Sequence, residues 1–155
     1  MEIQIEIKME RGKRKEMRDL NTITAESFAQ YGTVIGFPKE FTGDFLILET
    51  EQEEPWRMAV FRYENHKIDV LEHHPTSKES FEPMSGVTVL LVALHDTPEK
   101  WEAFLLDQPV CLKKGIWHQV LALTEEAVVK ITENLEVESV FYQLDVPVGV
   151  AVMEM

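Results

Sequence analysis

The chain has 155 residues, of which 45% are hydrophobic and 28% are charged, and its formal net charge at pH 7 is -13. This size and composition predict one globular domain, residues 1–155, with one sizeable core. The acidic balance argues against nucleic acid and anionic membranes as partners, because both bind basic surfaces. The single cysteine, Cys111, excludes a disulfide within the chain and a CxxC zinc site. No apolar stretch approaches a membrane span and no signal-peptide core is present, so we expect a cytoplasmic protein.

The first 18 residues differ in character from the rest and form an N-terminal arm. Ile3, Ile5 and Ile7 alternate with polar residues, which predicts a half-buried or edge strand. The basic run RGKRKEMR, residues 11–18, fits either a patch for a polyanion or a solvated turn, and we favour the turn. The arm could also pair with the sheet of a partner, because an edge strand offers unpaired backbone groups.

A short helix is expected next. Thr24 is a good N-cap, and Gly32 supplies a C-terminal stop. Phe28 and Tyr31 lie three residues apart, so their rings can share the side that faces the core. After the helix, Pro38 indicates a loop, and the acidic residues 49–54 are most simply a solvated turn.

Residues 56–63, WRMAVFRY, predict a strand with two alternating faces. Arg62 shares one face with Met58 and Val60, whereas Arg57 and Phe61 lie on the other. Arg62 therefore has two interpretations: its guanidinium extends to the rim of a barrel, or it binds a substrate carboxylate at a cavity.

The remaining pattern is a regular series of short strands separated by turns. Residues 87–94 are apolar on both faces, as in a central strand of a closed or sandwiched sheet. The apolar tail, residues 146–155, indicates either a last strand or a dimer contact. This series predicts an all-β barrel or jelly roll. The other candidate strands are residues 70–74, 101–106, 110–112, 117–123, 127–132 and 138–144.

Two polar stretches stand out, EHHPTSKESFEPMSG at residues 72–86 and KKGIWHQ at residues 113–119. By strand alternation Glu72 and His74 share one face and His73 points away, so we exclude His73 as a ligand and expect it at a surface or interface. The first stretch resembles the first cupin motif, G-x5-H-x-H-x(3,4)-E-x6-G, with Glu79 and Gly86 at its last two positions. The second stretch resembles the middle of the second cupin motif.

A narrower resemblance covers residues 20–138. The order Glu-x-His-Pro, then Phe-x-Pro-Met, then Trp-His is similar to the ureidoglycolate lyase family within the cupins. The resemblance implies a double-stranded β-helix, the cupin jelly-roll barrel, with a short N-terminal helix. It also implies cleavage of ureidoglycolate to glyoxylate and urea. The residues that carry it are Glu72, His74, Pro75, Phe81, Pro83, Met84, Trp117 and His118.

In a cupin barrel Glu72, His74, Glu79 and His118 would converge inside the open end. Such a set suits a divalent metal ion, zinc, manganese, iron or nickel, and the alternative is a metal-free polar pocket. The resemblance implies proton transfer by His118 or Glu79, with Glu72 and His74 as ligands or orienting groups. It implies that Arg62 binds the substrate carboxylate.

These inferences predict a small anionic substrate and a homodimer that shares sheet edges. Two other functions stay open. One is a different small-molecule cupin enzyme, such as a sugar isomerase or a metal-dependent oxygenase. The other is a non-catalytic cupin that binds a small ligand.

Overall fold

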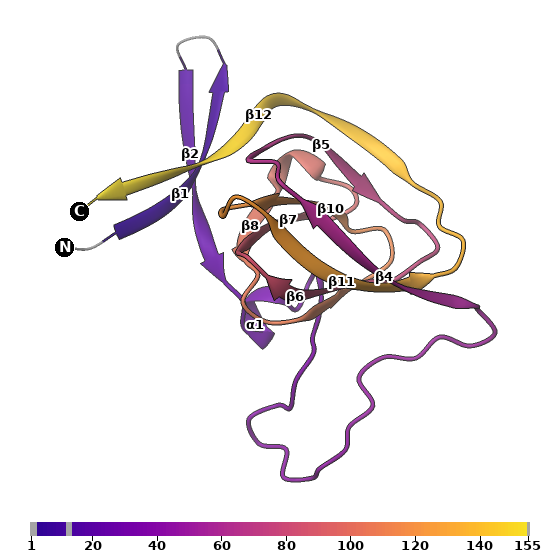
Figure 1. Cartoon of the computed structure of the whole chain (residues 1–155). Helices are drawn as coiled ribbons and strands as arrows, with labels where there is room; N and C mark the ends of the chain where they lie inside the picture. Colours follow the sequence, from indigo (N-terminus) through magenta and orange to yellow (C-terminus); the bar gives the residue numbers. More distant parts are fainter. Residues whose placement is uncertain (1–2, 12–13, 155) are drawn as a thin grey trace.

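The computed structural model describes residues 3–11 and 14–154, with side chains for residues 16–150. Nearly all regular structure is β-strand (Figure 1). One short helix, α1 (Ala25–Phe28), and one 3₁₀ turn, η1 (Pro98–Lys100), complete the described part. The strands are β1 (Ile3–Arg11), β2 (Arg14–Thr22), β3 (Gly32–Val34), β4 (Trp56–Tyr63), β5 (Lys67–His73), β6 (Glu79–Ser85), β7 (Thr88–Ala93), β8 (Glu102–Leu105), β9 (Val110–Leu112), β10 (Trp117–Ala122), β11 (Ala127–Asn134) and β12 (Val140–Glu154).

The strands form two sheets. Sheet A has the order β1-β12-β5-β10-β7-β8-β2 and closes on itself, because β1 also pairs with β2. Sheet B has the order β3-β9-β6-β11-β4. The only parallel pair among the described strands is β2 with β8. The expected all-β barrel with a short N-terminal helix is therefore confirmed.

Two hydrophobic clusters occupy the two faces of sheet A. The first lies between the sheets and joins residues of sheet A, such as Leu90, to residues of sheet B, such as Val129. The second lies on the opposite face of sheet A and includes Leu91 and Leu121. Strand β7 contributes to both clusters, and all six of its residues are buried. This confirms the interpretation as a central strand with two buried faces for residues 88–93, whereas Val87 and Leu94 lie outside the strand and are exposed.

The N-terminal region confirms some expectations and corrects others. Residues 3–11 form the expected strand. The favoured turn over residues 11–18 is wrong for residues 14–18, because β2 begins at Arg14 and pairs with β1. Residues 12 and 13 lie outside the described part. Arg18 on β2 lies 3.9 Å from the centre of the Trp101 ring and donates to the Trp101 carbonyl at 2.7 Å, so its charge does not prevent packing.

Three further elements differ from expectation. Thr24 caps α1 as expected, in a capping box with Ser27, but the helix ends at Phe28, well before Gly32. The sequence pattern missed β6, whose Pro83 lies beside a register shift in the pairing with β11, a position that tolerates proline. The two candidate strands at the C-terminus form one long strand, β12.

In the described residues, no helix has the length and apolar character that a bilayer span requires.

Candidate active site

The four side chains expected at the site converge in one cavity of about 260 Å³. Glu72 on β5 and His118 on β10 are direct cross-strand partners in sheet A, and His74 follows β5. Glu79 begins β6 in sheet B. The two sequence motifs also meet through the backbone, because the Gly115 amide donates to the His74 carbonyl at 3.0 Å. Both sheets therefore contribute to the cavity, and the four residues meet only because the sheets pack together.

Glu79 lies at the centre of the group. Its Oε2 atom is 3.1 Å from His74 Nε2 and 2.9 Å from His118 Nε2. Glu72 approaches from the other side, with Oε1 at 3.8 Å from His118 Nε2. The side chains of His74, His118 and Glu79 are at most 7% exposed, whereas that of Glu72 is 28% exposed. Glu72 is therefore the member of the group most open to an incoming molecule.

Backbone carbonyls orient both imidazoles. His74 Nδ1 lies 2.9 Å from the Glu138 carbonyl oxygen, and His118 Nδ1 lies 2.9 Å from the Ile116 carbonyl oxygen. A carbonyl oxygen only accepts hydrogen bonds, so each Nδ1 carries the proton. In the neutral ring, Nε2 then presents its lone pair to the Glu79 carboxylate. This is the usual outer support of a histidine that binds a metal ion.

The contact between Glu79 Oε2 and His118 Nε2 is short but is not a well-aligned hydrogen bond, and both atoms are buried without such a partner. Two lone pairs at this separation repel unless a proton or a cation lies between them. The donors fit a divalent cation, because the ligand atoms of Glu72, His74 and His118 lie within 4.8 Å of one another. Nitrogen and carboxylate oxygen ligands suit zinc and other borderline metal ions.

Without a metal ion, protons lie between the Glu79 carboxylate and the two imidazoles. Burial alone would lower the pKa of His74, but the Glu79 carboxylate and the Glu138 carbonyl raise it to about 9. Burial would raise the pKa of Glu79, but the His118 and His74 imidazoles lower it to about 2. The pKa of His118 is raised by Glu79 against the opposing effect of burial. The metal-free cavity therefore favours an ionised carboxylate between two protonated rings.

Sequence reasoning missed two residues of the cavity, Arg57 and Glu133. Glu79, Glu133 and Arg57 lie side by side across β6, β11 and β4. Arg57 donates to Glu133 Oε2 from Nε at 3.0 Å and from Nη2 at 2.7 Å. Among the described residues, Arg57 is the only arginine or lysine that lines this cavity. Glu133 also lies within ligand distance of His74 and Glu79.

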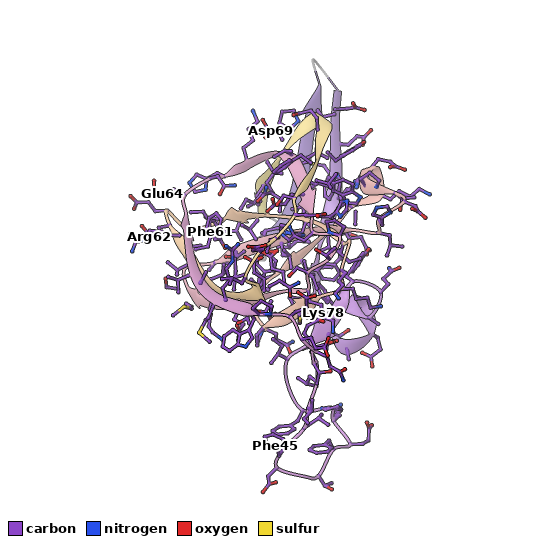
Figure 2. All side chains as sticks on the ribbon, turned by 90° about the vertical axis from the view of Figure 1, so that its right-hand side faces the viewer. Phe45, Phe61, Arg62, Glu64, Asp69 and Lys78 are labelled. Atoms are coloured by element: carbon purple, nitrogen blue, oxygen red, sulfur yellow. The ribbon has the colours of Figure 1, made fainter. Side chains whose placement is uncertain are left out.

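Arg62 does not lie at the cavity. Its side chain is 73% exposed, faces outward in Figure 2, and pairs with Glu126 at 3.5 Å. Buried Tyr63 shows which face of β4 points inward, and Arg57 and Phe61 share that face. The two faces of β4 are similarly apolar, so alternation alone did not reveal which arginine faces the cavity.

His73 points away from the cavity, as strand alternation indicates. It is not at a surface, however, because only 4% of it is exposed. Its ring packs edge-on against Trp117, with centroids 4.3 Å apart, and against His95, with centroids 5.0 Å apart. The expectation of a surface position is wrong, because the outer face of sheet A carries its own hydrophobic cluster.

Comparison with known proteins places these residues in a family context. The family model described as ureidoglycolate lyase matches residues 48–146. The ureidoglycolate lyase of Agrobacterium fabrum is 39% identical over 61 residues, which cover 36% of this chain and 37% of that protein. The ureidoglycolate lyase of Rhodobacter capsulatus is 29% identical over 123 residues, which cover 66% of this chain and 76% of that protein.

The first of these relatives is thus matched over little more than a third of its own length. Among solved structures, a Bacillus subtilis oxalate decarboxylase variant is similar with a TM-score of 0.45 and 17% identity, over 59% of this chain and 24% of that chain.

Proposed function

The chain belongs to the ureidoglycolate lyase family, and from this premise we propose that it cleaves ureidoglycolate to glyoxylate and urea. The observation that carries the proposal is the cavity in which Glu72, His74, Glu79 and His118 converge with their polar atoms facing one another. All four residues lie within the segment that the family model matches. The cavity volume of about 260 Å³ suits a small substrate.

The reaction requires two proton movements. Ureidoglycolate is a hemiaminal that carries a carboxylate. A base removes the hydroxyl proton, the C–O bond becomes the carbonyl of glyoxylate, and the C–N bond breaks. The electron pair of that bond goes to the urea nitrogen, which takes a proton from an acid. The site must therefore supply one base, one acid and a group that binds the carboxylate.

The cavity has a residue for each role. His118 is the acid, because its raised pKa keeps a proton available for the urea nitrogen. Glu72 is the base, because it is the most open of the central carboxylates. Glu79 is a weak base at its lowered pKa, so it orients the two imidazoles. Arg57 takes the role that the family resemblance implied for Arg62, since three of its five N–H groups are not used by Glu133.

As the alternative to the protonated cavity, we propose a divalent metal ion, zinc, manganese, iron or nickel, held by Glu72, His74 and His118 with Glu79 beside them. In that metal-bound form His118 and Glu72 are ligands, and proton transfer falls to Glu79. When bound, such an ion would polarise the substrate hydroxyl and make its proton easier to remove. The Nδ1 contacts of both imidazoles already hold the Nε2 atoms in the orientation that metal binding requires. We propose in addition that the protein acts in allantoin degradation in the cytoplasm, as a homodimer.

The test combines metal analysis with an assay of glyoxylate release. Protein purified without added metal is analysed for the four metals and then supplied with ureidoglycolate. The wild type should release glyoxylate, and His118→Ala should lower kcat/KM at least about 100-fold, the usual contribution of a general acid. His95→Ala is the control, because its side chain is 63% exposed and lies outside the cavity.

Two results would contradict the proposal. Glyoxylate release by His118→Ala at the wild-type rate would remove this residue from the chemistry. A wild type that releases no glyoxylate with any of the four metals would leave a ligand-binding cupin or a different cupin enzyme as the function.

A further inference from the structure

A carboxylate and a guanidinium lie side by side in the cavity. Glu133 on β11 is the cross-strand partner of Arg57 on β4. On its other side, Glu133 is the cross-strand partner of Glu79 on β6. The side chain of Glu133 is 8% exposed, whereas that of Arg57 is 47% exposed. Glu133 therefore lies between the more exposed arginine and the buried ionic group around Glu79.

The hydrogen bonds of this pair leave both partners able to bind a ligand. Arg57 Nε and Nη2 both donate to Glu133 Oε2, at 3.0 Å and 2.7 Å. In the part of the chain that the structure describes, no group donates a hydrogen bond to Glu133 Oε1. A guanidinium has five N–H groups, and an ionised carboxylate only accepts hydrogen bonds. The pair can therefore bind one anionic group and one N–H group at the same time.

The proposed substrate carries these two groups next to each other. In ureidoglycolate the carboxylate and the ureido N–H are attached to the same carbon atom. When the carboxylate binds the free N–H groups of Arg57, the ureido N–H lies beside the neighbouring carboxylate, Glu133. The other two carboxylates of the cavity have different tasks, because Glu79 contacts the imidazoles and Glu72 is the proposed base. Glu133 is thus the carboxylate that is left to accept from the ureido group.

We propose that Glu133 is a specificity-determining residue, which selects carboxylates that carry an N–H donor beside the carboxylate group. The inference rests on the proposed function, because it names the ligand class of that same cavity, the N-carbamoyl derivatives of small acids. An N–H donor satisfies Glu133 Oε1. A carboxylate without such a donor meets an unsatisfied negative charge, and the repulsion weakens its binding. Glyoxylate has no N–H group, so the same residue favours release of this product.

Two unreactive ligands of the same shape test this selection. N-carbamoylglycine has the carboxylate and the ureido group but lacks the hydroxyl group that the cleavage requires. 4-Oxopentanoate has the same carbon and oxygen skeleton with both nitrogens replaced by carbon, so it lacks only the N–H donors. Titration calorimetry on the wild type should show at least about tenfold tighter binding of N-carbamoylglycine, the value of one hydrogen bond to a charged group.

Substitution of Glu133 should abolish this preference. In Glu133→Gln the amide oxygen still accepts from Arg57, but the amide nitrogen cannot accept from the ureido N–H. N-carbamoylglycine should then bind about tenfold more weakly, whereas 4-oxopentanoate should bind at least as tightly as it does to the wild type, because the repelling charge is gone. Arg57→Met should weaken both ligands to a similar extent.

Glu82→Gln is the matched control. Glu82 pairs with Lys130 at 2.9 Å on the same two strands, β6 and β11, but neither residue lines the cavity. This variant should bind both ligands as the wild type does. Circular dichroism checks the fold of every variant. Glu133→Asp, which withdraws the carboxylate by one methylene group, replaces Glu133→Gln if that variant unfolds.

Four results would overturn the inference. They are a wild type that binds both ligands equally, a wild type that binds neither, an equal loss of both ligands in Glu133→Gln, and the same loss of preference in Glu82→Gln. An equal loss in Glu133→Gln would reduce Glu133 to a support for Arg57. Neither ligand can be cleaved, so this experiment and the glyoxylate assay fail separately: selective binding without glyoxylate release contradicts only the lyase activity, and release without selective binding contradicts only the role of Glu133.

Discussion

The Glu79 carboxylate is shared by two imidazoles whose other nitrogens are held by backbone carbonyls. This arrangement leaves the rings little freedom to turn away, so the charge between them must be balanced by protons or by a metal ion. The cavity holds a second ion pair, between Arg57 and Glu133. The Arg57 guanidinium keeps N–H groups that do not donate to Glu133. In the proposed function, the first of these ionic groups is the reacting centre and the second binds the substrate carboxylate.

The two arginines of β4 provide a matched pair of substitutions. Arg57→Met removes the guanidinium from the cavity and should lower kcat/KM for ureidoglycolate roughly 10- to 100-fold, the value of a charge-assisted contact. Arg62→Met removes a guanidinium that is 73% exposed and should leave the kinetics unchanged. Steady-state glyoxylate release measures both. A large effect of Arg62→Met with no effect of Arg57→Met would reverse this assignment.

At the scale of elements, a tight connection fixes the position of β6, the strand that carries Glu79. Gly86 joins β6 to β7 with a φ of 70°, a left-handed conformation that favours glycine. A Cβ atom at this position would lie 2.2 Å from the carbonyl oxygen of Glu126, the residue that precedes β11. The position is therefore restricted both by backbone conformation and by the neighbouring chain.

Gly86→Ala should lower the free energy of unfolding by about 1–3 kcal/mol, because the strained φ and the clash both oppose folding. Gly36→Ala is the control, since a Cβ atom there has no neighbour within 4 Å. That variant should differ from wild type by less than about 0.5 kcal/mol. Urea unfolding followed by circular dichroism measures both values. An equal effect of the two substitutions would show that the packing around Gly86 is not the cause.

At the scale of the whole molecule, the buried ionic group links stability to pH. The pKa of His74 is raised from 6.5 to about 9 in the folded protein, so its contribution is complete below pH 6.5 and is lost as pH rises through 9. The pKa of Glu79 is lowered from 4.5 to about 2, so its contribution is complete above pH 4.5 and is lost as pH falls through 2. Both contributions are complete between pH 4.5 and 6.5.

Chelator-treated protein should therefore lose stability between pH 6.5 and 9, by an amount on the order of 3 kcal/mol from this group. Chemical unfolding at a series of pH values measures the change. His74→Gln and Glu79→Gln should each flatten the profile in this range, whereas His95→Gln should not. A profile of the wild type that is already flat from pH 6.5 to 9 would contradict the assigned protonation.

The sequence by itself determined the local features of this protein. Alternation along β5 placed Glu72 and His74 on one face and His73 on the other, and Thr24 marked the start of α1. These predictions hold because side-chain alternation and helix capping depend on neighbours a few residues away. The motif spacing also selected four of the six charged or imidazole groups that meet in the cavity.

Only the tertiary structure decided which face of β4 points inward. Alternation divides a strand into two faces but does not say which is buried, and on β4 both faces are apolar. Glu133 and Arg57 enter the cavity through pairing with β6 and β11, which are distant in the chain. Likewise, the buried position of His73 depends on the second hydrophobic cluster, which covers the face of sheet A that points away from the cavity. Such choices depend on long-range contacts between strands, which the local pattern of one strand does not contain.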